Sequence, residues 1–249
     1  MFLKFFILAA TFLLSCADVE RDSLYDSEGI NYGGKDLVEA PGKGNDIANY
    51  RTVRIGEQVW MAENLDYRVP FSRCYDNIAS NCGAYGRLYD WATAMALPAM
   101  CNFIVCISQI SAKHRGICPE GWHIPSREDW SELLFHVDSE NGGDGYYYDE
   151  YYAYDSYTAG RYLKANSGWL ENGNGEDKYE FSALPGGGGE WNGSDLWDFN
   201  YGGRYGVWWS SSEYDDSGVA RLSMPYNSEY AYYTNDGKPH LYSVRCLQD

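Results

Sequence analysis

Two short segments that lie far apart in the chain constrain its fold more than any other feature. Residues 118–130, CPEGWHIPSREDW, contain a cysteine, a turn with Pro119 and Gly121, a short apolar strand and the start of a helix. Residues 243–249, SVRCLQD, alternate apolar and polar side chains like a strand and carry a second cysteine. A disulfide between these segments would attach the end of the chain to its middle, which is worth on the order of 5 kcal/mol in the chain-entropy model.

The first residues, MFLKFFILAATFLLSC, have the pattern of a signal segment. One early basic residue, Lys4, precedes an apolar run over 5–14 that is too short to span a bilayer. The ending LLSC resembles the cleavage box of bacterial lipoproteins, which predicts a signal peptide over 1–15 and lipidation of Cys16. A plain secretory signal that is cut nearby is the alternative. We expect the protein at the cell envelope, on the outer membrane or cell surface, with the membrane as a partner through its lipid.

The residues that follow predict a linker and then a domain. Residues 16–50 are polar, include several glycines and lack apolar periodicity, which indicates a flexible tether that reaches about 30 Å as a coil. Residues 51–249 remain for the folded part and are enough for a single domain with its own core.

The cysteines predict disulfides, because they persist outside the cytoplasm. The chain has seven cysteines, and six remain when Cys16 is set aside for lipidation. Six cysteines allow several connectivities, and the spacing favours three pairs. These are Cys74 with Cys82, Cys101 with Cys106, and Cys118 with Cys246. Metal ligation is the competing use, but the sequence contains neither a CxxC pair nor a Cys/His cluster with zinc spacing.

The charge of the chain limits its partners. A formal net charge of −17 excludes nucleic acid and disfavours anionic membrane surfaces, because both repel an acidic protein. Clustered carboxylates suit calcium, and one stretch places four oxygen-bearing side chains among glycines. These are Asn172, Asn174, Glu176 and Asp177. The spacing is not that of an EF-hand, and a glycine-rich turn is the alternative, so no cofactor follows from it directly.

Apolar periodicity predicts one hairpin and two main helices in the first part of the domain. Alternation over 53–61 around a Gly-Glu turn is typical of a β-hairpin. Helical spacing predicts a helix over 87–97 and another over 126–136. The second begins at Ser126, which forms the pattern of a capping box with Asp129. Its expected buried stripe is Trp130, Leu133, Leu134 and Val137.

The second part predicts loops and then strands. Residues 138–157 contain many tyrosines and acids and no base, which indicates a solvated insertion. A short helix is expected over 159–165, followed by turns and loops. The last fifty residues read as antiparallel strands: VWWSSSE, GVARLSMPY, EYAYYTN and HLYSVRC. Few helices with late antiparallel strands and long loops predict the α+β class.

Six motifs occur in an order that resembles a known family. They are RTVRIGEQVWMAENLDY, the CYDN to NCGAYGRLYDWATAM run, CPEGWHIPSREDWSELL, YEFSALPGG, GVWWSSSE and SVRC. This series closely resembles the Fibrobacter succinogenes major paralogous domain, FISUMP, over 51–249. The resemblance implies a secreted or lipid-anchored bacterial protein with a C-type-lectin-like fold, in the same group as the formylglycine-generating enzymes. Within that group HIPSREDW looks like the strand-turn-helix entry and SVRC like the closing strand.

No catalytic constellation is recognisable in the sequence. The formylglycine-generating enzymes rely on a pair of functional cysteines, whereas every cysteine from Cys74 onward has a plausible disulfide partner here. The serines of residues 210–212 lack a GxSxG elbow, and the four histidines lack HExxH spacing. We therefore predict a binding module rather than an enzyme. An enzyme related in fold to formylglycine generation and a purely structural envelope or adhesin component are the alternatives.

The aromatic content is the best indication of a ligand. Nine Trp and 24 Tyr exceed what a core of this size needs, so some must be exposed. The ligand-binding candidates are Trp191, Trp197, Tyr147, Tyr151 and Trp209. Of these, Trp209 follows Trp208 in a strand, where core packing is favoured for both although they face opposite sides. The expected ligand is a glycan or an envelope protein that aromatic and acidic loops contact.

Overall fold

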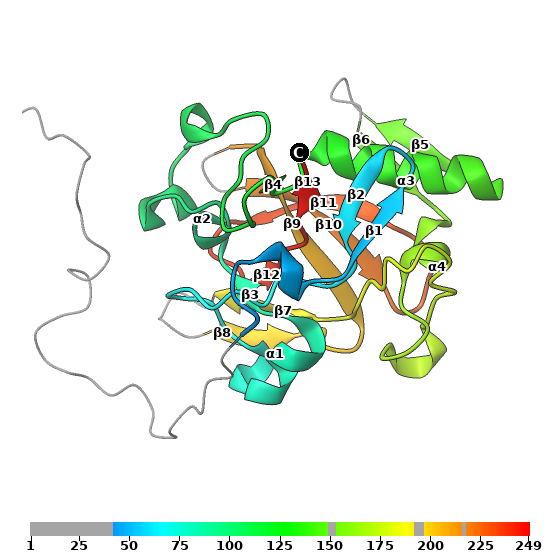
Figure 1. Cartoon of the computed structure of the whole chain (residues 1–249), viewed down its shortest axis with the longest axis horizontal. Coiled ribbons are helices and arrows are strands. Elements are labelled where there is room, and N and C mark those ends of the chain that lie inside the picture. Colours follow the sequence, from blue (N-terminus) through cyan, green and yellow to red (C-terminus); the bar gives the residue numbers. More distant parts are fainter. Residues whose placement is uncertain (1–41, 149–152, 192–196, 216–217) are drawn as a thin grey trace, which may run out of the picture. The chain divides into compact units, whose positions relative to one another are not determined.

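Two β-sheets frame the part of the chain that the computed structural model describes, residues 42–148, 153–191, 197–215 and 218–249 (Figure 1). All of these residues belong to the unit Asp36–Asp249. Within them, one sheet has four strands in the order β1 (Thr52–Ile55), β2 (Gln58–Met61), β13 (Leu247–Gln248) and β4 (Trp122–His123). The other has five, in the order β11 (Tyr232–Gly237), β10 (Gly218–Pro225), β9 (Tyr205–Glu213), β12 (Tyr242–Ser243) and β3 (Leu88–Tyr89). With helices on these sheets, the fold is of the α+β class, as predicted.

The end of the chain closes the four-stranded sheet. Leu247 of β13 lies opposite Trp60 of β2 and His123 of β4, so the last strand is inserted between the first hairpin and the middle of the chain (Figure 1). Cys246, the residue before β13, is bonded to Cys118. The predicted disulfide therefore joins the same two segments that the strand pairing brings together.

The predicted hairpin is formed by β1 and β2. Ile55 pairs with Gln58, which leaves Gly56 and Glu57 as the two turn residues. Gly56 has a φ of +58°, and a Cβ at this position would lie 3.0 Å from the ring of His136. Glycine is therefore required both by the turn conformation and by the close approach of the helix that carries His136.

The long helix α3 (Arg127–Asn141) begins as the capping box predicts. The Ser126 hydroxyl accepts from the Asp129 backbone N–H, while the Asp129 carboxylate accepts from the Ser126 backbone N–H. All four residues of the predicted stripe are buried, and Trp130 lies between Trp60 and Trp208, with ring centroids 4.5 and 6.3 Å away. The helix continues past the predicted end near 136 because the first left-handed position is Gly142, with a φ of 62°.

The helix predicted over 87–97 is wrong in its first half. Leu88 and Tyr89 form the strand β3, and only the four residues of α2 (Trp91–Ala94) are helical. Asp90 separates the two, because its side chain accepts a hydrogen bond of 2.9 Å from the Thr93 backbone N–H and so acts as an N-cap. Both elements are buried on all sides, so their apolar spacing did not distinguish strand from helix.

The acidic, tyrosine-rich stretch over 138–157 is more regular than predicted. It starts with the end of α3 and then forms a hairpin of β5 (Gly145–Tyr148) and β6 (Ala153–Ser156). The strand β6 packs on α3 and bridges to the five-stranded sheet through Ser156 and Ala231. The predicted short helix follows as α4 (Ala159–Leu163).

The four predicted late strands correspond to β9, β10, β11 and β12. Both faces of β9, the middle strand of the five-stranded sheet, are covered by hydrophobic clusters. Trp208 belongs to the cluster that contains α3, and Trp209 to the cluster that contains α2. A second hairpin, β7 (Gly188–Trp191) and β8 (Trp197–Asn200), attaches through a bridge between Gly189 and Leu241.

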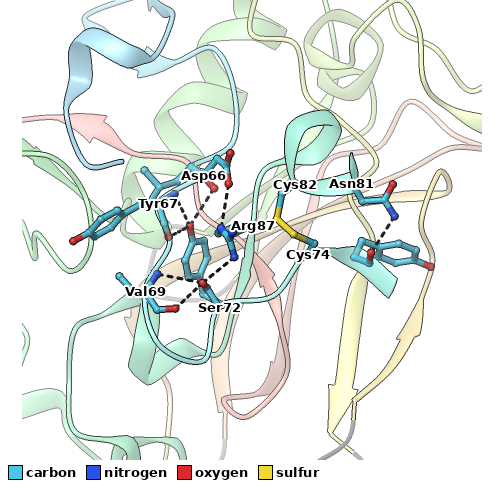
Figure 2. Close-up of a disulfide and its surroundings, with 11 residues drawn as sticks. Asp66, Tyr67, Val69, Ser72, Cys74, Asn81, Cys82 and Arg87 are labelled. Atoms are coloured by element: carbon cyan, nitrogen blue, oxygen red, sulfur yellow. Dashed lines mark hydrogen bonds and ion pairs between the residues drawn. A yellow bond between two sulfur atoms is a disulfide. The ribbon is translucent and has the colours of Figure 1, made fainter. Parts of the chain in front are cut away.

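The three predicted disulfides are all formed, and Figure 2 shows the surroundings of Cys74–Cys82. This bond ties the middle of α1 (Ala79–Tyr85) to the preceding loop. Beside it, the buried Arg87 guanidinium lies 3.2 Å from the Asp66 carboxylate and 3.4 Å from the Ser72 hydroxyl. The loop is thus held by a covalent link on one side and an ion pair on the other.

Packing starts before residue 51. Tyr50 belongs to a hydrophobic cluster, and its hydroxyl donates a hydrogen bond of 2.8 Å to the Gly44 carbonyl. The Asp46 side chain caps a single helical turn, Ile47–Asn49. The last nine residues of the predicted tether therefore pack on the domain, while residues 1–41, including the predicted lipidation site Cys16, lie outside the described residues.

Candidate functional site

A pocket of about 350 Å³ lies where the first turn of α3, the β5–β6 hairpin and the strand β11 meet. Its volume is in the range of small-molecule sites. We call it the tyrosine pocket. Its lining residues are Arg127, Tyr146, Asp155, Tyr214, Ala220, Tyr233, Thr234 and Asn235.

The capping of α3 places Arg127 at the pocket. Arg127 is the first helical residue, and its backbone N–H donates to the Ser212 hydroxyl at 3.0 Å. Its carbonyl accepts a hydrogen bond of 2.9 Å from the Tyr233 hydroxyl. These two bonds fix the start of the helix to β9 and β11, so the position of the guanidinium follows from the fold.

Asp155, in strand β6 of the β5–β6 hairpin, supplies a buried carboxylate to the pocket. One of its oxygens accepts a hydrogen bond of 2.8 Å from the Tyr233 backbone N–H, and the other lies 3.4 Å from the Tyr146 hydroxyl. Burial raises the pKa of Asp155 to about 6, although both hydrogen bonds oppose the shift. The carboxylate therefore changes its protonation state close to neutral pH, which makes this group a candidate for function.

Three exposed tyrosines extend from the pocket across the surface. The ring centroids of Tyr146 and Tyr157 are 5.6 Å apart, and those of Tyr157 and Tyr230 are 5.2 Å apart. Such neighbouring rings form a continuous aromatic surface with polar hydroxyl ends. We call these three residues the tyrosine row.

One hydroxyl group in the pocket is unsatisfied. Thr234 Oγ1 is shielded from solvent and has no hydrogen-bond partner within the described residues. Buried hydroxyls are normally paired, so an unpaired one in a pocket lining is suited to a polar ligand. Asn235, the next residue of β11, adds an exposed amide beside it.

Two of the predicted aromatic candidates have described side chains, and they differ. Tyr147 is exposed, as required of a ligand contact, but it packs on Phe135 and Tyr154 rather than lining the pocket. Trp209 is fully buried, and its indole N–H donates to the Tyr89 carbonyl at 2.7 Å. The prediction of Trp209 as a ligand-binding residue is therefore corrected, because this side chain belongs to the core.

The other aromatic candidates are less completely described. Trp191 and Trp197 pair with each other across the β7–β8 hairpin, and their side chains lie outside the described part of the structure. Tyr151 lies wholly outside it. None of the three is among the residues that line the tyrosine pocket as described.

Of the four predicted calcium ligands, Asn172 ends a helical turn (Leu170–Asn172), and the other three follow it with separate hydrogen-bond partners. The Asn174 side chain accepts from the Trp169 backbone N–H at 3.1 Å. Glu176 pairs with Arg161 at 2.6 Å. Asp177 accepts from the backbone N–H and hydroxyl of Ser182, and Asn172 is exposed with a φ of 62°. In the structure these side chains organise turns, and calcium binding at this stretch stays a prediction.

The histidine with the strongest carboxylate contacts is buried at the junction of the four-stranded sheet. His123 Nδ1 lies 2.8 Å from an Asp249 oxygen, and Nε2 lies 3.5 Å from an Asp129 oxygen. Burial alone lowers the pKa of His123, but the two carboxylates outweigh it and the net shift is upward. Within the described residues, no group of three or more His, Cys, Asp or Glu side chains is arranged to hold a metal ion.

Most pocket residues were not recognised from the sequence. Tyr146 and Asp155 lie in the stretch 138–157 that was expected to be a solvated insertion. Arg127 lies in the segment 118–130 and Asp155 in the acidic stretch 138–157, but neither was singled out for binding, and Thr234 lies about a hundred residues further along the chain. One signal was available: Arg127 immediately follows the N-cap serine, a position at which side chains reach the neighbouring loops.

Comparison with known protein families gives a match over most of the chain. Residues 53–248 match the family model described as the Fibrobacter succinogenes major domain. No curated protein and no solved structure matches the chain. None of the helices within the described residues is long and apolar enough to cross a membrane.

Proposed function

This chain belongs to the Fibrobacter succinogenes major domain family, and from that premise we propose that it is a non-catalytic binding module of the bacterial cell envelope that takes a glycan in the tyrosine pocket. The observation that carries the proposal is the combination of exposed tyrosine rings with a carboxylate, a guanidinium, an amide and an unpaired hydroxyl in one pocket.

This chemistry suits a sugar better than an apolar ligand. A pyranose ring has apolar C–H faces that pack on aromatic rings, and the tyrosine row offers such a surface. Sugar hydroxyls both donate and accept, so Asp155 would accept from one hydroxyl while Arg127 and Asn235 donate to others. Polar groups at the base of a pocket fix the orientation of a ligand and give specificity.

The proposal includes a C-type-lectin-like fold for the domain. It is supported by the insertion of β13 between the first hairpin and β4, and by the disulfide that joins Cys246 to Cys118. In that fold, long loops supported by a closed frame carry the binding residues, and the tyrosine pocket is likewise formed by a hairpin, a helix start and a strand end.

The cell-envelope location is supported by the disulfides and by the N-terminal pattern. Three disulfides within one domain are typical of proteins outside the cytoplasm. The signal pattern over 1–15 and the lipidation box at Cys16 point to a membrane-anchored protein with a linker before the domain.

The binding role is favoured over an enzyme related to formylglycine generation. Such an enzyme needs a reactive thiol pair, and the most central cysteines, Cys118 and Cys246, are bonded to each other and buried. Two alternatives remain: a module that binds a protein in place of a glycan, and a structural component of the envelope. Glycan-binding measurements distinguish both from the glycan proposal.

The proposal is tested with the full chain on a glycan array and in polysaccharide pull-downs, with and without calcium. A glycan that binds should lose at least about tenfold in affinity in Asp155→Asn and Tyr146→Ala, because each change removes a hydrogen bond or a stacking surface. Tyr201→Ala is the matched control, since Tyr201 is equally exposed but does not line the pocket. Absence of glycan binding in both conditions contradicts the glycan proposal, and a protein partner whose capture depends on Asp155 would replace it.

A further inference from the structure

A loop beside α2 exposes a group of large apolar side chains. Residues 99–107 comprise the helical turn Ala99–Asn102, the Cys101–Cys106 disulfide and the first residue of a second turn, Ile107–Gln109. We call this segment the apolar loop. Its outward side chains are each between 44% and 59% exposed: Met100, Phe103, Ile104, Val105 and Ile107. Contiguous apolar side chains on a surface mark interaction sites when they are this numerous.

The loop is held in this conformation by its polar groups. The Asn102 side chain donates to Asp90 at 2.8 Å and accepts from the Ala92 backbone N–H at 2.9 Å. The Cys106 backbone N–H donates to the Glu213 carboxylate at 2.9 Å. Because the backbone and polar groups face the domain, the apolar side chains are directed to the outside by the scaffold.

The charge around the loop differs from that of the rest of the protein. The chain has 36 acidic residues, about one in seven, yet residues 91–119 contain none. The ionisable side chains in this stretch are Lys113, His114 and Arg115, and Lys113 and Arg115 are exposed. The net charge of −17 repels anionic surfaces in general, whereas this segment carries two exposed basic side chains and no acid.

We propose that the apolar loop inserts into the interface of a phospholipid bilayer, with Lys113 and Arg115 contacting lipid phosphates. Short apolar segments flanked by basic residues bind membranes in this way, with the apolar part at the boundary of headgroups and acyl chains. The inference is independent of the glycan proposal, because it rests on different residues.

The composition of the loop favours lipid over a protein partner. Residues 92–121 contain neither Tyr nor Trp, although the chain has 24 Tyr and nine Trp. Protein interfaces concentrate their binding energy in Tyr, Trp and Arg, which combine apolar area with hydrogen-bonding groups. The tip side chains are aliphatic, thioether or phenyl groups without a hydrogen-bond donor, which suits contact with hydrocarbon.

Membrane contact at this loop would also place the tyrosine pocket near the bilayer. Glu213, which accepts from the loop, is followed directly by Tyr214, which lines the pocket. The two sites therefore share the end of β9.

The test places a reporter at the tip of the loop in the full chain. Phe103→Trp is compared with the parent protein on vesicles of phosphatidylcholine and phosphatidylglycerol that contain brominated lipid. The added fluorescence should shift to the blue and be quenched by bromine. Ile107→Trp serves as a second reporter, and because both positions are exposed, neither change should disturb folding. Tyr201→Trp, at an exposed residue outside the loop, is the control reporter and should not be quenched.

The charge contribution is tested in the Phe103→Trp background. Lys113→Gln with Arg115→Gln should raise the concentration of anionic vesicles needed for half-maximal quenching roughly thirtyfold. The concentration needed with phosphatidylcholine alone should change little. Arg54→Gln with Lys178→Gln is the matched control, since both side chains are exposed elsewhere in the domain. If neither tip reporter is quenched, whether or not the chain associates with vesicles, the proposal is overturned. Capture of a protein partner by the loop without quenching overturns it in favour of a protein interface.

Discussion

The Lys238 ammonium donates a hydrogen bond of 2.5 Å to the Glu213 carboxylate, and the side chains of both residues are withdrawn from solvent. The same ammonium donates to the Ile104 carbonyl at 3.0 Å and lies 5.3 Å from the ring centroid of Trp91. The carboxylate also accepts from the Cys106 backbone N–H. One buried ion pair therefore supports the apolar loop on one side and the end of β9 on the other.

Removal of one member of this pair should be strongly destabilising. Lys238→Met leaves the Glu213 carboxylate buried without its counter-charge, which costs about 3–5 kcal/mol of unfolding free energy. Lys238→Met with Glu213→Gln should recover part of this loss, because no isolated charge remains. Urea denaturation followed by tryptophan fluorescence measures both.

An exposed ion pair provides the comparison. Arg161 and Glu176 lie 2.6 Å apart with both side chains about half exposed, so Arg161→Met should destabilise the protein far less than Lys238→Met. If Lys238→Met and Arg161→Met lower the free energy of unfolding equally, burial does not increase the contribution of the Lys238–Glu213 ion pair.

The disulfides should differ in their contribution according to the length of chain that they close. Cys118 and Cys246 are 128 residues apart, whereas Cys101 and Cys106 are five apart. In the chain-entropy model, replacing the first pair by alanine costs about 5 kcal/mol and replacing the second about 2 kcal/mol. All four cysteines are buried, so the lost packing is similar and the difference reflects the loop length. Thermal unfolding of the two double variants measures it, and a reversed order would contradict the prediction.

Asp155 should make both ligand binding and stability depend on pH. Burial raises its pKa from 3.8 to about 6, so the folded state favours the protonated form. This contribution to stability is complete below pH 3.8 and is lost as the pH rises through 6. Asp155→Asn, which keeps an acceptor for the Tyr233 N–H, should therefore be more stable than the parent at pH 7 by up to about 3 kcal/mol, and no more stable at pH 3.5.

The same group predicts the pH profile of glycan affinity. If the ionised Asp155 accepts from a sugar hydroxyl, the affinity should fall by up to about tenfold per pH unit below 6. Calorimetric titrations between pH 5 and 8 would show this slope in the parent and not in Asp155→Asn. A flat profile in the parent would contradict a role for this carboxylate in binding.

His123 should stabilise the junction of the four-stranded sheet under mildly acidic conditions. Its pKa is raised above 6.5 because the Asp129 and Asp249 carboxylates outweigh the effect of burial. The stabilisation is fully present below pH 6.5 and is lost as the pH rises through the higher pKa of the folded state. His123→Gln should remove this part of the stability change between pH 6 and 9. Urea denaturation at pH 6 and pH 9 measures the change, and an unaltered difference in His123→Gln would contradict the prediction.

Much of the frame was predictable because its signals are local. The capping box of Ser126 and Asp129 forms within four residues, and the hairpin depends on a two-residue turn. The short disulfides follow from spacing alone. The error over 87–97 has a local cause as well, since Asp90 acts as an N-cap and divides one apolar run into a strand and a helix.

The sequence by itself determined the family, the class of fold, the disulfide pairs and the surplus of aromatic side chains. Only the tertiary structure decided which of those side chains meet solvent. Alternation along β9 places Trp208 and Trp209 on opposite faces, but both faces are covered because α3 packs in the cluster on one side and α2 in the cluster on the other. The tyrosine pocket depends in the same way on Arg127 and Asp155 being brought together from separate elements. Such contacts depend on how sheets and helices pack across the chain, and no spacing within a single segment specifies them.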